Sequence, residues 1–144
     1  MHRAARALLF AMSVSGLMTA SVQANSGGIA AIPLNNGQET TDAKFGGSGF
    51  FTYTVGGGSL CYTLTVRNLT GAPFAAHIHG VAERTVAAPV LVPLTPPSAA
   101  TGTSSACVAV APDLLAAIVA NPGDYYVNVH TAAFPGGEVR GQLK

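Results

Sequence analysis

The chain has 144 residues, of which 49% are hydrophobic and 9% are charged, and its formal net charge is +1. Seven basic residues are balanced by six acidic ones, without a basic stripe, which argues against binding to nucleic acid or to an anionic membrane surface. This length is typical of a single domain.

The first 24 residues have the three-part pattern of a secretory signal peptide. Arg3 and Arg6 give a positive start, residues 7–20 form an uncharged apolar run, and Ala24 ends a small-residue cleavage pattern. The alternative is a membrane anchor, but this run is shorter than the roughly 20 residues that a spanning helix needs. We therefore expect cleavage after Ala24, a single domain at 25–144 without a membrane span, and a periplasmic or extracellular location.

The first half of the mature chain predicts short strands. Residues 29–34 form an apolar stretch, and residues 48–55 follow a pair of glycines. Residues 59–67 alternate Leu, Tyr, Leu and Val with Cys, Thr, Thr and Arg, which is the period-two pattern of a half-buried strand. The glycines at 56–58 join the second and third strands into a hairpin.

The second half continues this pattern with one interruption. Further strands are expected at 74–81, 89–94, 106–111, 124–131 and 138–143. Prolines near both ends of 89–94 indicate an edge strand, and the Pro- and Ser-rich residues 95–105 indicate a loop. Pro112 and Asp113 begin a short helix near 112–121. Seven or eight short strands with one helix predict an all-β fold, either a Greek-key β-sandwich or a small barrel.

Two cysteines remain in the mature chain, Cys61 and Cys107. An even, low number in an exported domain favours one disulfide, and the chain-entropy model assigns roughly 4 kcal/mol to a bridge of this span. The alternative is a pair of thiol ligands for a metal. It has less support because the two residues are far apart and no Cys-x-x-Cys motif occurs.

Three histidines give the mature chain its most distinctive polar pattern. His77 and His79 alternate with Ala76 and Ile78, so both imidazoles lie on the polar face of one strand. His130 lies on the polar face of a later strand. Imidazoles from two neighbouring strands could converge on one ion. Three such nitrogen ligands suit zinc or copper and leave one coordination position open.

The last two strands are expected to pair around a loop at 133–137. This register places His130 opposite Arg140, Asn128 opposite Gln142 and Ala132 opposite Glu138. A slip of one residue would move apolar residues to the polar side. The hairpin therefore predicts one polar network with five members: Asn128, His130, Glu138, Arg140 and Gln142.

The histidines consequently have alternative interpretations. The first is a hydrogen-bond network that stabilises strand ends and loops, and the second is a copper or zinc site formed by His77, His79 and His130. Arg140 favours the network, because a guanidinium near a dication is unfavourable unless Glu138 neutralises it. A third interpretation of the histidines is a pH-sensitive surface. We find no nucleophile or phosphate-loop motif, so we expect no enzymatic activity. We also expect no cofactor, unless the three histidines bind copper or zinc.

Five motifs follow one another along the mature chain. They are Gln38-Glu39, Ala-His-Ile-His-Gly at 76–80, Pro-Val-Leu-Val-Pro-Leu at 89–94, Tyr-Val-Asn-Val-His-Thr at 126–131 and Gly-Glu-Val-Arg-Gly-Gln-Leu at 137–143. Together they resemble the CHRD domain, a module named after chordin, over residues 30–143. The resemblance implies an immunoglobulin-like β-barrel in an exported protein, and no activity or catalytic residue comes with it. The loop after His79 departs from the Gly-rich run common in the family, which puts a ligand-binding role of that loop in doubt.

A second, weaker resemblance is to copper/zinc superoxide dismutases, exported β-barrels that also carry a His-x-His motif. Three histidines are too few for their bimetal site, so we expect no dismutase chemistry. The leader and the CHRD resemblance together predict an exported, non-enzymatic protein. Its expected role is structural or binding, in the cell envelope or outside the cell, with an unknown protein or surface as partner. The alternative is a copper- or zinc-binding envelope protein.

Overall fold

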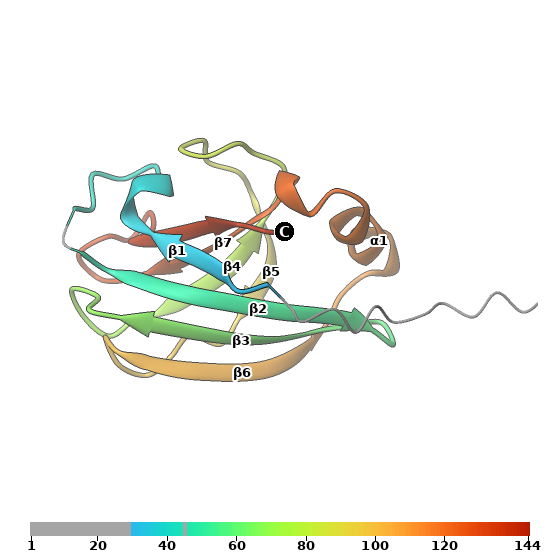
Figure 1. The fold of residues 1–144 in the computed structure, drawn as a ribbon, viewed down its shortest axis with the longest axis horizontal. Helices are drawn as coiled ribbons and strands as arrows, with labels where there is room; N and C mark the ends of the chain where they lie inside the picture. Colours follow the sequence, from blue (N-terminus) through green and yellow to red (C-terminus); the bar gives the residue numbers. More distant parts are fainter. Residues whose placement is uncertain (1–29, 45) are drawn as a thin grey trace, which may run out of the picture.

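A computed structural model describes residues 30–44 and 46–144, and the predicted signal peptide at 1–24 lies outside the described residues. Eight antiparallel strands of this part of the chain form one sheet in the order β5-β4-β7-β8-β1-β2-β3-β6. The sheet curls into a nearly closed barrel (Figure 1). An apolar groove between edge strands β5 and β6 marks the opening. The predicted all-β fold is confirmed as a small barrel.

The strands have the following bounds: β1 Ile32–Asn35, β2 Ser48–Gly56, β3 Ser59–Arg67, β4 Ala75–His79, β5 Val90–Leu94, β6 Gly102–Ala109, β7 Tyr126–His130 and β8 Val139–Gln142. The helix α1 is Pro112–Ala120. Two short 3-10 turns, η1 at Asn36–Gln38 and η2 at Pro122–Asp124, complete the described elements. The helix begins at the predicted proline, and β5 lies at an edge of the sheet as its prolines predicted.

The expected strand at 106–111 is the least accurate prediction, because β6 begins at Gly102 inside the predicted loop. β6 pairs with β3 from Gly102 to Ala109. Hydroxyl contacts at Thr65–Thr103 and Thr63–Ser105, both at 2.9 Å, accompany this ladder on the outer face. Pairing with a neighbouring strand therefore outweighs the loop-like composition of this segment.

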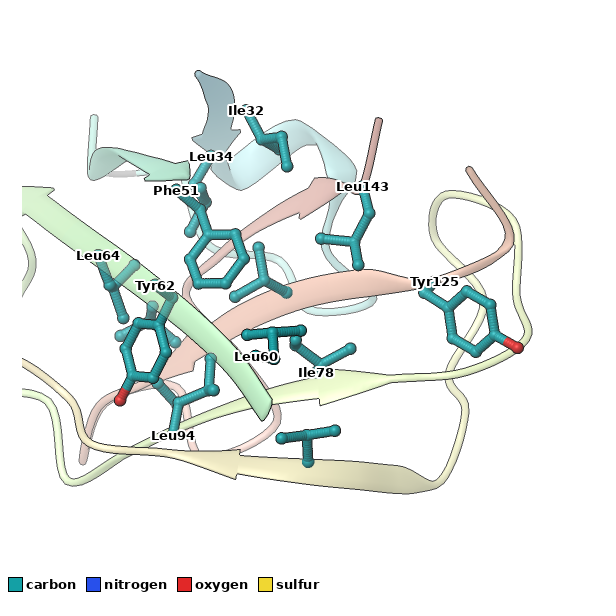
Figure 2. Close-up of a cluster of buried hydrophobic side chains, with 14 of the residues drawn as sticks. Ile32, Leu34, Phe51, Leu60, Tyr62, Leu64, Ile78, Leu94, Tyr125 and Leu143 are labelled. Carbon is teal, nitrogen blue, oxygen red and sulfur yellow. The ribbon is translucent and has the colours of Figure 1, made fainter. Parts of the chain in front are cut away.

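The core fills the interior of the barrel (Figure 2). Leu60, Leu64 and Val66 of β3 are fully buried and alternate with more exposed residues, as the period-two pattern predicted. On β4, Ala76 and Ile78 point into the same core. The helix α1 lies beside one end of the barrel and buries Leu115 and Ile118 against the core (Figure 1). These inward faces leave the alternate residues of β4 and β7 on the outside of the barrel.

The β7–β8 hairpin differs from the predicted register by two residues. Asn128 lies opposite Arg140, and Tyr126 lies opposite Gln142. The prediction of His130 opposite Arg140 and Ala132 opposite Glu138 is therefore wrong. The loop is wider than expected, because the buried Glu138 side chain accepts a hydrogen bond from Thr131 at 2.6 Å instead of facing Ala132. A slip of two preserves the face of every side chain, so the polar residues still share one side.

The predicted disulfide between Cys61 and Cys107 is present. The two cysteines lie directly opposite each other in the β3–β6 ladder, with their Cα atoms 3.9 Å apart. The bridge lies on the outer face and connects the edge strand β6 to its neighbour. The alternative of two thiol ligands for a metal is therefore excluded.

Candidate metal centre

The structure brings the three predicted histidines together on the outside of the barrel. β4 pairs with β7, with His77 opposite Asn128 and Ala75 opposite His130. Because strand neighbours lie about 5 Å apart, this register places the imidazoles of both strands side by side. One ligand nitrogen from each of His77, His79 and His130 lies within 4.8 Å of the other two. The three side chains could therefore hold one ion.

Two backbone carbonyls fix the protonation of two of these rings. Nδ1 of His79 donates to the Ala88 carbonyl at 2.8 Å, and Nδ1 of His130 donates to the Pro135 carbonyl at 2.9 Å. A carbonyl oxygen only accepts hydrogen bonds, so both Nδ1 atoms carry a proton, and in the neutral form of each ring the lone pair is on Nε2. Metal-binding histidines in proteins commonly donate their other ring nitrogen in this way.

The two Nε2 atoms have different surroundings. Nε2 of His130 lies 3.0 Å from Nδ1 of His77, at hydrogen-bond distance. Nε2 of His79 is buried and has no hydrogen-bond partner among the described residues. A buried acceptor without a partner is unfavourable and requires an explanation. An ion bound by Nε2 of His79, Nε2 of His130 and Nδ1 of His77 would provide one.

Burial favours the uncharged form of His77 and of His130. The pKa of His77 is lowered from 6.5 to about 4, mainly by desolvation and to a smaller extent by the neighbouring His130 and His79. Desolvation likewise lowers the pKa of His130, although the Pro135 carbonyl partly opposes this change. Metals bind neutral imidazole, so these two ligands are ready for a metal at neutral pH.

The cluster remains accessible from the side of His77. His77 is only partly buried, whereas His79 and His130 are 6% and 7% exposed. Phe74 lies beside His130, with 6.1 Å between ring centroids, and its own side chain is 60% exposed. An ion could therefore enter past His77 and Phe74 and keep one coordination position toward solvent.

Arg140 is separated from the histidines by Tyr126. The Arg140 guanidinium carbon lies 3.3 Å from the centroid of the Tyr126 ring. The His79 ring is stacked parallel to the same phenol, at 4.7 Å between centroids. β4 and β8 lie on opposite sides of β7, so His79 and Arg140 flank the ring from opposite sides. The predicted conflict between the guanidinium and a dication is thus reduced by an intervening aromatic ring.

The five members of the predicted polar network do not form one connected group. Arg140 and Gln142 are hydrogen-bonded to each other at 2.8 Å, whereas His130 bonds to His77 and Pro135. Glu138 accepts hydrogen bonds from Thr131 and Thr70 instead of approaching Arg140. Asn128 lies between these groups and bonds with the buried Glu39.

The described residues match the model of the family described as the CHRD domain, over residues 30–143. The chain belongs to the CHRD domain family. A search of the curated proteins and a search of the solved structures gave no match. Membership in the CHRD family and the internal disulfide both fit an extracellular or periplasmic protein. Within the described residues, every helix is too short or too polar to cross a bilayer.

Sequence reasoning missed three contributors to the histidine cluster of this CHRD domain. Tyr126 could have been found, because strand parity places it on the same face as Asn128 and His130. The carbonyls of Ala88 and Pro135 could not have been found from the sequence, because the pattern of side chains does not predict where a loop places its backbone oxygens. Both carbonyls come from loops, one between β4 and β5 and the other between β7 and β8.

Proposed function

We propose that this CHRD domain is an exported metal-binding protein that holds copper or zinc at His77, His79 and His130. The observation that carries the proposal is the buried Nε2 of His79, which has no hydrogen-bond partner among the described residues while its Nδ1 is already used by Ala88. Three imidazole nitrogens suit both metals, and the Irving–Williams order favours tighter binding of Cu(II). The proposed role is binding, without an assigned reaction.

The leading alternative is that the histidines form only a structural network, as part of an exported structural or protein-binding module. The contact between His77 and His130 at 3.0 Å supports it, because one ring can donate to the other without a metal. The two functions make different predictions. A structural network requires the imidazoles in every condition, whereas a metal site gains stability only when the metal is present.

We expect Cu(II) or Zn(II) to raise the melting temperature of the purified, disulfide-intact protein by several degrees, because the ion binds only the folded state. The double variant His77→Ala/His79→Ala should lose this gain, and the Cu(II) electron paramagnetic resonance spectrum of the wild type should show coupling to imidazole nitrogens. Val119→Ala, which changes an exposed side chain of the helix α1, should retain the gain and serves as the control.

Equal melting temperatures with and without either metal would overturn the metal site. In that case, His77→Ala should still lower the free energy of unfolding by about 1–3 kcal/mol through its lost hydrogen bond to His130.

A further inference from the structure

The proposed metal ligands do not account for the burial of the Arg140 side chain. Its side chain is fully buried, and its described hydrogen bonds all go to neutral oxygen atoms. Burial of a guanidinium is costly even when its hydrogen bonds are satisfied. Gln142 accepts two of these bonds, and the others go to backbone carbonyls of a single loop.

That loop, residues 80–89, connects β4 to β5 and has no regular secondary structure. Arg140 donates to the carbonyls of Val86 at 2.8 Å, Glu83 at 2.6 Å and Ala82 at 3.4 Å. The loop contributes little to the core, since Val81 and Val86 are 69% and 52% exposed. Its position therefore depends on bonds from outside the loop, and Arg140 supplies three of them.

The end of the same loop holds His79. The Ala88 carbonyl accepts from Nδ1 of His79 at 2.8 Å, and the Ala88 amide donates to the Tyr126 hydroxyl at 3.1 Å. Tyr126 is in turn stacked between His79 and the guanidinium of Arg140. Arg140 is thus connected to His79 in two ways. One is through its hydrogen bonds to the loop backbone, and the other is through the stacked phenol ring of Tyr126.

We infer that Arg140 is a positioning residue for His79, which it orients through Tyr126 and the 80–89 loop so that Nε2 faces the metal. The inference rests on the proposed metal-binding function, but its first consequence concerns the metal-free protein. The Ala88 carbonyl can hold the proton on Nδ1 of His79 only while the loop is in place. Groups that orient a ligand in this way typically change metal affinity about tenfold to hundredfold when they are removed.

Two variants separate the charge of Arg140 from its geometry. Arg140→Met removes both, whereas Arg140→Lys retains the charge but lacks the planar fork that reaches several carbonyls and stacks on a ring. Tyr126→Phe keeps the stack and removes only the hydroxyl that binds the Ala88 amide. Arg84→Met makes the same substitution as the first variant at an exposed arginine of the same loop, and it is the matched control.

The test has one measurement without metal and one with Cu(II). In the metal-free protein, nitrogen-15 NMR of the histidine rings should show His79 protonated at Nδ1 in the wild type and in Arg84→Met. Arg140→Met and Arg140→Lys should shift His79 toward a mixture of tautomers. With Cu(II), both Arg140 variants should bind about tenfold to hundredfold more weakly and give an altered paramagnetic resonance spectrum, and Tyr126→Phe should have a smaller effect.

A His79 ring that stays protonated at Nδ1 in Arg140→Lys and Tyr126→Phe would overturn the inference, and so would an unchanged Cu(II) affinity in both. If Arg140→Met does not fold, the results for Arg140→Lys and Tyr126→Phe decide whether the inference holds. If the wild type binds no Cu(II), the proposed function fails, and the tautomer measurement alone decides whether Arg140 positions His79.

Discussion

At the scale of single residues, a buried carboxyl group links the stability of the domain to pH. Glu39 is 5% exposed, and desolvation raises its pKa from 4.5 to about 7, although the Thr40 amide, Arg140 and Asn128 oppose the change. The folded state therefore binds the Glu39 proton more tightly than the unfolded state. The stability that this provides is present below pH 4.5 and is lost as the pH rises through 7.

Glu39→Gln should remove this dependence. Relative to the wild type, the variant should gain stability between pH 5 and pH 8, by up to about 3 kcal/mol, because it has no carboxyl group to ionise. The lowered pKa values of His77 and His130 act in the opposite direction, with stability lost as the pH falls below 6.5, but they affect both proteins equally. Urea unfolding at several pH values measures the difference, and a constant difference across this range would contradict the prediction.

Gly137 lies against the same carboxyl group, in a backbone conformation that requires glycine. Its φ is +129°, and a Cβ atom there would overlap Oε1 of Glu39. Gly137→Ala should therefore lower the free energy of unfolding by roughly 2–3 kcal/mol, from backbone strain and from displacement of the carboxylate. Gly71→Ala is the control, because its Cβ would have no neighbour within 4 Å. Equal losses for both variants in urea unfolding would show that the contact is not the cause.

At the scale of the elements, local patterns predicted strands well where alternation was strong. The bounds of β3 agree with the prediction at both ends, because Leu, Tyr, Leu and Val form one face without interruption. β6 was predicted too late in the chain, because its first residues are Gly, Thr and Ser, which favour loops by composition. Their strand conformation comes from pairing with β3, whose partner residues are distant in the sequence.

The disulfide stabilises this non-local pairing. Cys61 and Cys107 are separated by 46 residues, and their bridge joins β6 to the rest of the sheet. The double variant Cys61→Ser/Cys107→Ser should lose about 2–4 kcal/mol of unfolding free energy, mainly because the unfolded chain regains its loop entropy. Urea unfolding of the variant beside the oxidised wild type measures this loss. Reduction of the wild type should give a similar value, and unchanged stability in both cases would refute this contribution.

At the scale of the whole molecule, the histidine cluster exists because β4 and β7 are neighbours. Residues 75–79 and 126–130 are far apart in the sequence, and the chain passes through β5, β6 and α1 between them. Strand parity alone predicted that His77 and His79 share a face and that His130 lies on a similar face. Nothing in either segment specifies the other as its partner, because strand pairing depends on the order of the whole sheet.

The sequence by itself determined the all-β class, the disulfide pair, the outward faces of the histidines and the resemblance to the CHRD family, because each depends on local periodicity or on a motif. Only the tertiary structure decided the strand order, the register of the last hairpin and the convergence of three imidazoles. It also decided the tautomers of His79 and His130, because the carbonyls of Ala88 and Pro135 come from loops whose positions are set by distant groups such as Arg140. The direction of a side chain along a strand depends only on the local alternation of residues. By contrast, the position of two strands and a loop relative to one another depends on the complete barrel.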